Sequence, residues 1–132
     1  MNQQKQAFSR PLPAGFDAPL SLAVRKGPIL ALSGQIPVHP VTGELVGTAF
    51  AEQLTQVLDN VSSALALAGA TLGDVVSMRV YLRDMTYFAE MNEIYARLVP
   101  SPYPARTTLI APLPLGMLVE VEALAVVGMD QE

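Results

Sequence analysis

Residues 117–127 read MLVEVEALAVV, and their strict alternation decides the fold. Successive side chains of a β-strand point to opposite faces of the sheet, so this segment has two different faces. One face is wholly apolar and is predicted to lie in the core; it comprises Val119, Val121, Ala123, Ala125 and Val127. The other face sets two carboxylates, Glu120 and Glu122, among aliphatic residues. The pattern therefore predicts a strand with one buried face and one face of mixed character.

Further strands precede this segment. They are predicted over residues 20–24, 29–36, 75–82 and 105–111. The first two are separated by Lys26-Gly27-Pro28 and are expected to form a hairpin. The third is expected to bury Val76, Met78, Val80 and Leu82. A proline-rich break over residues 112–116 separates the last two strands, which are a second candidate hairpin.

Two helices are predicted from apolar residues that recur at the helical period. The stripe of the first comprises Leu54, Val57, Leu58, Val61 and Leu65. Thr48 is its candidate N-cap, and Gly69 is its candidate C-terminal stop. The stripe of the second comprises Phe88, Met91, Tyr95 and Leu98, and Asp84 or Thr86 is its candidate cap.

The predicted order is β-β-α-β-α-β-β, which favours an α+β fold with two helices on one face of a mixed sheet. We expect a single domain over residues 17–132 after an N-terminal arm over residues 1–16. Hydrophobic residues make up 51% of the chain, and charged residues make up 15%, against about 25% in typical domains. So few charges favour burial of part of the surface in a subunit interface.

Composition also argues against several classes of function. Eight Lys and Arg against twelve Asp and Glu leave a net charge of −4, which argues against nucleic-acid binding. The absence of cysteine excludes disulfides, thiolate chemistry and a Cys-ligated metal site, and the single histidine, His39, predicts no zinc site. The polar N-terminus and the lack of an apolar run of about 18 residues predict a cytoplasmic protein without a membrane span.

Arg106 and Glu120 are the first candidates for chemistry. A carboxylate among aliphatic side chains is partly desolvated, which raises its pKa and lets it hold a proton or orient water. A guanidinium binds a carboxylate through two parallel hydrogen bonds. If their two strands pair, both side chains could face one pocket; otherwise each is an ordinary surface charge. Ser33-Gly34 could present a hydroxyl and backbone N–H groups to a ligand, and Asn92 is a polar residue of the second helix.

Six short motifs occur in order from about residue 20 onward. They are Ser33-Gly34-Gln35-Ile36-Pro37, Pro40-Val41-Thr42-Gly43, Gln53 with Asn60, Asn92-Glu93-Ile94-Tyr95, Pro104-Ala105-Arg106 and Glu120-Val121-Glu122-Ala123. Together they resemble the RidA family of reactive-intermediate enamine/imine deaminases. The resemblance implies a chorismate-mutase-like fold and a homotrimer with a central barrel and clefts between subunits. It also implies hydrolysis of 2-imino or 2-enamino acids, such as 2-aminoacrylate or 2-iminobutanoate, to 2-keto acids and ammonia without a cofactor.

The resemblance also implies residue roles. Arg106 matches the arginine that binds the substrate carboxylate, and Glu120 matches the glutamate that helps to position the attacking water. Substrate-binding positions are matched by Ser33, Gly34, Asn92 and Thr108. Two features depart from the family pattern. Leu20 stands where many members have a tyrosine, and it supplies no hydroxyl. The stretch between Arg106 and Glu120 is one residue shorter than in other members.

Two alternatives to a deaminase remain open. One is a trimer that binds small acids or protects proteins without catalysis, since an acid-binding arginine serves both roles equally well. The other is a ribonuclease, an activity also attributed to this family, which the acidic balance of the chain argues against.

Overall fold

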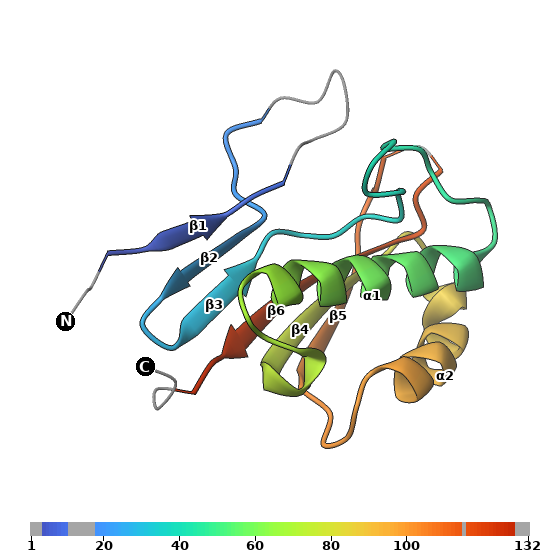
Figure 1. Ribbon diagram of the computed structural model, residues 1–132. Helices are drawn as coiled ribbons and strands as arrows, with labels where there is room; N and C mark the ends of the chain where they lie inside the picture. The colour runs from blue at the N-terminus through green and yellow to red at the C-terminus, as the bar shows by residue number, and fades with distance from the viewer. Residues whose placement is uncertain (1–3, 11–17, 115, 129–132) are drawn as a thin grey trace.

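The computed structural model describes residues 4–10, 18–114 and 116–128. These residues contain a six-stranded sheet (Figure 1). Its strands are β1 (Gln6–Phe8), β2 (Ala23–Lys26), β3 (Ile29–Leu32), β4 (Val75–Leu82), β5 (Ala105–Ile110) and β6 (Val119–Val126). They lie in the order β1-β2-β3-β6-β4-β5. The pair β4 and β5 is parallel, and the other pairs are antiparallel, so the sheet is mixed.

Two helices, α1 (Phe50–Leu67) and α2 (Phe88–Leu98), cover the same face of this sheet (Figure 1). Short 3-10 turns, η1 (Leu72–Asp74) and η2 (Met85–Tyr87), precede β4 and α2. The predicted α+β class, a mixed sheet with two helices on one face, is therefore confirmed. Within the described ranges, no helix is long and apolar enough to cross a membrane.

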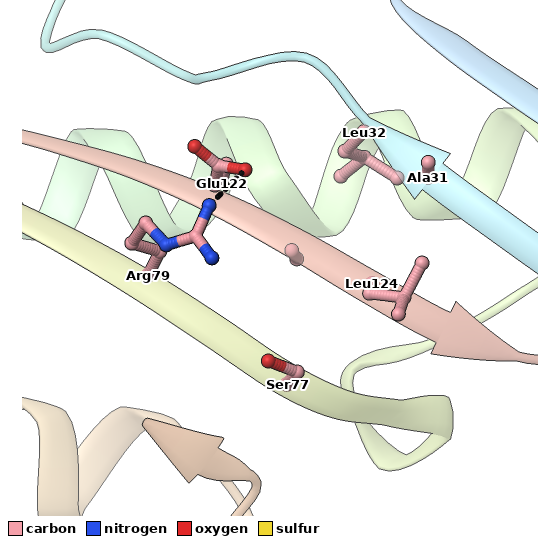
Figure 2. Close-up of a pocket in the computed structure, with 7 residues that line it drawn as sticks. Ala31, Leu32, Ser77, Arg79, Glu122 and Leu124 are labelled. Atoms are coloured by element: carbon pink, nitrogen blue, oxygen red, sulfur yellow. Dashed lines mark hydrogen bonds and ion pairs between the residues drawn. The ribbon is translucent and has the colours of Figure 1, made fainter. Parts of the chain in front are cut away.

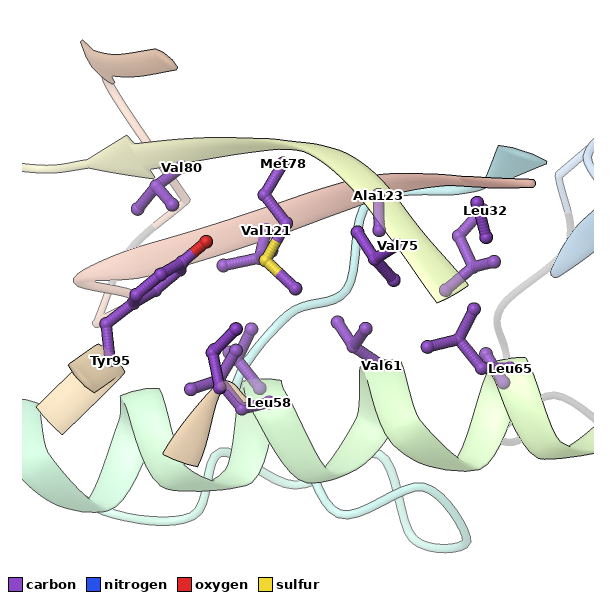
Figure 3. Close-up of a cluster of buried hydrophobic side chains, with 14 of the residues drawn as sticks. Leu32, Leu58, Val61, Leu65, Val75, Met78, Val80, Tyr95, Val121 and Ala123 are labelled. Carbon is purple, nitrogen blue, oxygen red and sulfur yellow. The ribbon is translucent and has the colours of Figure 1, made fainter. Parts of the chain in front are cut away.

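The core lies between the helices and the sheet (Figure 3). The predicted apolar stripe of α1 is buried and comprises Leu54, Val57, Leu58, Val61 and Leu65. The predicted apolar face of the last strand is buried as well and comprises Val119, Val121, Ala123, Ala125 and Val127. The side chains that alternate with these point away from the helices; we call this side of the sheet the open face.

The start of α1 differs from the prediction by one residue. Its N-cap is Ala49 and not Thr48, and the Ala49 side chain offers no acceptor. Glu52 compensates, because its Oε1 accepts the Ala49 N–H at 3.4 Å. Gly69 follows the helix as predicted, with a φ of +80° that favours glycine.

Both ends of α2 also differ from the prediction. Asp84 caps the preceding η2 turn, where its Oδ1 accepts the Thr86 N–H at 2.9 Å. Leu98 was expected in the core but is 37% exposed, whereas Ile94 is buried. The helix ends at Leu98, and Val99 turns into an extended conformation and fills the core instead.

A bulge near the start of β4 overturns one predicted core residue. Val75 pairs with Ala125, and Ser77 pairs with Leu124, so the register shifts between them. The extra residue turns Val75 into the core and leaves Val76 47% exposed. Strict alternation predicted Val76 as a core residue, and a bulge breaks that alternation.

The last two strands do not form a hairpin, because β4 lies between them. Helix α2 connects β4 to β5, and a helical crossover of this kind joins parallel strands. Residues after β5 and before β6 form hydrogen bonds with the end of β4. The Ala111 N–H donates to the Leu82 carbonyl at 2.9 Å, and the Arg83 N–H donates to the Leu118 carbonyl at 3.0 Å.

The N-terminal part of the sheet is shifted relative to the prediction. Strand β1 lies within the predicted arm and pairs with β2, although three residues were too few to show alternation. Strand β2 begins at Ala23, and Leu20 lies before it and is 50% exposed. Strand β3 ends at Leu32, so Ser33-Gly34-Gln35 follows the strand.

Candidate active site

The first cluster of candidate residues, the Glu120 group, consists of Ser33, Gly34 and Glu120. The Gln35 N–H donates to the Val121 carbonyl at 2.7 Å, and the Val121 N–H donates back to the Gln35 carbonyl at 3.1 Å. This bridge presses the backbone of Gly34 against the Glu120 carboxylate, so that a Cβ at residue 34 would overlap Oε2. Glycine is therefore the residue that leaves room for Glu120 here.

Ser33 is tied to the segment before β2. Its Oγ donates to the Ser21 carbonyl at 2.6 Å, and its N–H donates to the Leu22 carbonyl at 3.0 Å. Leu20 directly precedes Ser21, so it lies one residue from the carbonyl that accepts the Ser33 hydroxyl. The exposed side chain of Leu20 adds apolar surface there and no hydroxyl.

A second acid, Glu122, lies near Glu120 on the open face. Partial burial raises the pKa of Glu120, and the negative charge of Glu122 raises it further. Glu122 is itself held: Arg79 Nη1 lies 3.3 Å from its Oε2, and the Tyr81 hydroxyl donates to its Oε1 at 2.6 Å. This hydrogen bond to Glu122 is the main cause that raises the pKa of Tyr81.

A shallow depression of about 220 Å³ lies beside the ion pair of Arg79 and Glu122 on the open face (Figure 2). It is lined by Ala31, Leu32, Ser77, Arg79, Glu122, Ala123 and Leu124. Figure 2 shows the ion pair between Arg79 and Glu122 at one end and Leu124 at the other. The depression therefore offers a charge pair beside apolar side chains, but not Arg106.

The second cluster, the Arg106 group, consists of Asn92, Arg106 and Thr108. In the β4–β5 register Arg106 lies opposite Met78, and Thr108 lies opposite Val80. Met78 and Val80 are buried beneath the helices, so Arg106 and Thr108 face the helical side of the sheet. Strand β5 is the last in the sheet, which places these side chains at its edge.

Two aromatic rings of α2 lie against Arg106. Its Cζ is 5.0 Å from the ring centre of Tyr95 and 5.8 Å from that of Phe88. Asn92 lies between the two rings on the same face of the helix, four residues after Phe88 and three before Tyr95. Among the residues that the structure describes, Arg106 forms no ion pair and no hydrogen bond. Its guanidinium is therefore available to an anionic ligand.

The two clusters do not meet within one chain. Glu120 pairs with Tyr81 on the open face, whereas Arg106 faces the helices, and β4 separates their strands. The hypothesis that both side chains face one pocket across a hairpin is therefore wrong. A single chain presents half of the predicted site on each face of its sheet.

Two residues that anchor this region had no predicted role. Gln53 is fully buried; its Nε2 donates to the carbonyls of Gly47 and Gly116 at 2.8 Å, and its Oε1 accepts the Leu118 N–H at 2.7 Å. The signal for Gln53 was its place four residues before Val57 on the buried stripe.

Arg83 directly follows β4 and binds backbone carbonyls in the connection between β5 and β6. It donates to the carbonyls of Met117 at 2.8 Å and Pro114 at 2.6 Å, and also to that of Leu113. Nothing in the local sequence around Arg83 indicates this role, because its partners lie about thirty residues away.

Within the described residues, no group of three or more His, Cys, Asp or Glu side chains could hold a metal ion.

Comparison with known proteins adds a family to this geometry. The family described as endoribonuclease L-PSP matches residues 12–127. A RutC family protein of Pyrococcus horikoshii is 43% identical over 87% of this chain and 90% of its own. A 2-iminobutanoate/2-iminopropanoate deaminase of Dermatophagoides farinae is 32% identical over 93% of this chain and 97% of its own. The crystal structure of E. coli TdcF with bound serine superposes with a TM-score of 0.83 at 31% identity, covering 93% of this chain and 99% of that one.

Proposed function

The chain belongs to the endoribonuclease L-PSP family, and on that basis we propose that it hydrolyses reactive 2-imino and 2-enamino acids to 2-keto acids and ammonia. Relatives named reactive intermediate deaminase A and 2-iminobutanoate/2-iminopropanoate deaminase support this class of reaction. The observation that carries the proposal is Arg106, a partly buried guanidinium that no protein carboxylate neutralises within the described residues.

In the proposed reaction Arg106 holds the substrate by its carboxylate. Two parallel N–H donors fix the carboxylate plane, and the imine carbon is directly bonded to that carboxylate. The reacting carbon is therefore placed without any covalent bond to the protein, which is catalysis by positioning. Water adds to the carbon of the N-protonated C=N bond and loses one proton, which gives an amino alcohol. The amino nitrogen then gains a proton, the C–N bond breaks and ammonia leaves, and loss of the hydroxyl proton gives the 2-keto acid.

Glu120 is proposed to position the attacking water. Its ionised carboxylate accepts a hydrogen bond from water, and its raised pKa makes it a better proton acceptor than an exposed glutamate. Gly34 leaves the space that the Glu120 carboxylate occupies, and Ser33, the residue before it, is proposed to add a hydroxyl to the cleft. Asn92 and Thr108 would line the side of the cleft that holds the carboxylate.

We assign the complete site to a cleft between two copies of the chain, because one copy holds its two halves on opposite faces. The Arg106 group lies on the edge strand β5, where a neighbouring copy can approach. The open face exposes apolar residues that association would cover, among them Ile29, Leu109, Leu124 and Val126. A homotrimer with these faces turned into a central barrel would build three equivalent clefts.

A coupled assay tests the function. A threonine dehydratase generates 2-iminobutanoate in situ, and release of 2-ketobutyrate or ammonia is followed with and without this protein. We expect acceleration by the wild type and its loss in Arg106→Ala, with little recovery in Arg106→Lys because lysine lacks the planar fork. Arg97→Ala, which removes an exposed arginine of α2, is the matched control and should keep the wild-type rate.

Other outcomes of this assay separate the alternatives. A folded wild-type assembly that binds 2-ketobutyrate but leaves the imine untouched would support the binding or protective role instead. Nuclease activity that survives repurification and is abolished in Arg106→Ala would support a ribonuclease. Only the first of these results would contradict the deaminase for this substrate, because nuclease activity would add a second activity without excluding the first.

A further inference from the structure

Tyr95 carries a hydroxyl that the fold does not use. The residue is 4% exposed, and its Oη has no hydrogen-bond partner among the described residues. Figure 3 shows the ring reaching from α2 toward the sheet, with the oxygen among aliphatic side chains such as Val121. Burial raises the pKa of this phenol, so it stays neutral. Packing alone would be served at least as well by phenylalanine.

The face of the Tyr95 ring, in contrast to its hydroxyl, makes a contact: it lies against Arg106. The 5.0 Å between the guanidinium carbon and the ring centre is within the range of a cation–π contact, and Phe88 adds a second ring at 5.8 Å. No hydrogen bond or ion pair orients Arg106 in the described structure. The two rings are therefore what orients this guanidinium.

The Tyr95 ring is itself fixed from behind. Tyr103, in the connection between α2 and β5, packs against it with 6.2 Å between ring centres and a tilt of 48°. The Tyr103 hydroxyl donates to the Ala96 carbonyl at 3.3 Å, which ties that connection back to the helix. A ring held on both sides loses little freedom when a ligand binds, which favours affinity.

We propose that Tyr95, together with Phe88, is a positioning residue for Arg106 in recognition of the substrate carboxylate. An acidic partner would also fix a guanidinium, but it would compete with the substrate for the same N–H donors. An aromatic face attracts the cation and leaves the edge donors free. This proposal rests on the proposed function, because it gives Arg106 a carboxylate to bind.

The experiment compares three variants with the wild-type assembly. Tyr95→Phe keeps the ring, Tyr95→Leu removes it, and Phe50→Leu removes a buried ring that stacks on Tyr87 and not on Arg106. Two readouts are measured on each: the dissociation constant for 2-ketobutyrate by calorimetry, and the Nε–H resonance of Arg106 in protein with 15N-labelled arginine. The resonance is assigned by its absence in Arg106→Lys.

We expect Tyr95→Leu to weaken 2-ketobutyrate binding about 5-fold or more, the size that loss of a cation–π contact predicts. The Arg106 resonance should lose its ring-current shift in the same variant. Tyr95→Phe should keep both the affinity and the shift, and Phe50→Leu should keep both as well. In the coupled assay, Tyr95→Leu should need more substrate but approach the wild-type rate at saturation.

Unchanged affinity and an unchanged Arg106 resonance in a folded Tyr95→Leu protein would overturn the proposal. Equal losses in Phe50→Leu would overturn it too, because they would reflect general loosening of the core. If the wild type neither binds 2-ketobutyrate nor accelerates deamination, the proposed function fails. The Arg106 resonance in the same variants still decides whether the rings hold the guanidinium.

Discussion

At the scale of single residues, the closest fit in the candidate site is that of Glu120 against Gly34. Gly34 is exposed and its φ does not lie in the left-handed region, so the backbone itself would accept another residue. The constraint comes only from the carboxylate, which occupies the space of a Cβ. The glycine therefore serves the placement of Glu120 and not the stability of the fold.

Gly34→Ala separates these two properties. The added methyl must displace the Glu120 carboxylate, and a misplaced catalytic group predicts a fall in deaminase rate of about 10-fold or more. The urea midpoint of unfolding should hardly change. Gly73→Ala is the control, because a Cβ there meets only an ordinary contact with Thr71. Wild-type activity in folded Gly34→Ala would show that the reaction does not need the close approach of Gly34 to Glu120.

The charge of Glu122 gives a second prediction at this scale. Burial and the neighbouring Glu122 both raise the pKa of Glu120, so protonation of Glu120 should cut off activity at a higher pH than an exposed glutamate would. Glu122→Gln removes one of these causes and should move the acid limb of the rate profile to lower pH. Asp59→Asn, on the exposed side of α1, should not move it. An unmoved limb in Glu122→Gln would mean that another group controls it.

At the scale of elements, α1 does more than cover the sheet. Through Gln53 it holds the carbonyls of Gly47 and Gly116 and the N–H of Leu118, two residues before Glu120. Gln53→Met keeps the shape but leaves these three backbone groups unpaired. We expect a loss of about 2–4 kcal/mol in the free energy of unfolding, measured by urea titration. A loss below that seen for the partly exposed Gln56→Met would refute this role.

The spacing of apolar residues predicted a helix or strand well where each of its faces contacts a single environment, either the core or the surface. The stripe of α1 and the two faces of β6 follow from spacing alone, because packing against one partner imposes one period. Val76 and Leu98 were misplaced because a bulge and a helix end interrupt that period. The order of strands was not predictable from spacing, since nothing in the segments 105–111 and 117–127 shows that β4 lies between them.

The candidate site was predictable only as a list of residues. The motifs name Arg106 and Glu120 as candidate site residues, but the separation of these residues by β4 depends on the strand order. The role of Arg83 and the aromatic rings beside Arg106 depend on contacts between distant segments. No local pattern reports such contacts before the chain is folded.

At the scale of the whole molecule, the exposed apolar residues of the open face favour a subunit interface. We expect light scattering to give about 42 kDa, three times the 14.1 kDa of the chain. Leu124→Glu places a charge on the open face and should yield a species near the mass of one chain, because a buried unpaired charge disfavours association. Leu67→Glu, an exposed position on α1, should leave the mass unchanged. An unchanged mass in Leu124→Glu would place the interface elsewhere.

The central claim, a deaminase site built from Arg106 of one copy and Glu120 of another, is tested most directly by mixing two inactive variants. Arg106→Ala and Glu120→Gln chains are unfolded together at equal concentrations, refolded, and assayed for release of 2-ketobutyrate from 2-iminobutanoate. In random assemblies about one cleft in four receives both intact residues, so about a quarter of wild-type activity should return. If each site lay within a single chain, every chain would keep one defect, and the mixture would stay as inactive as its parts.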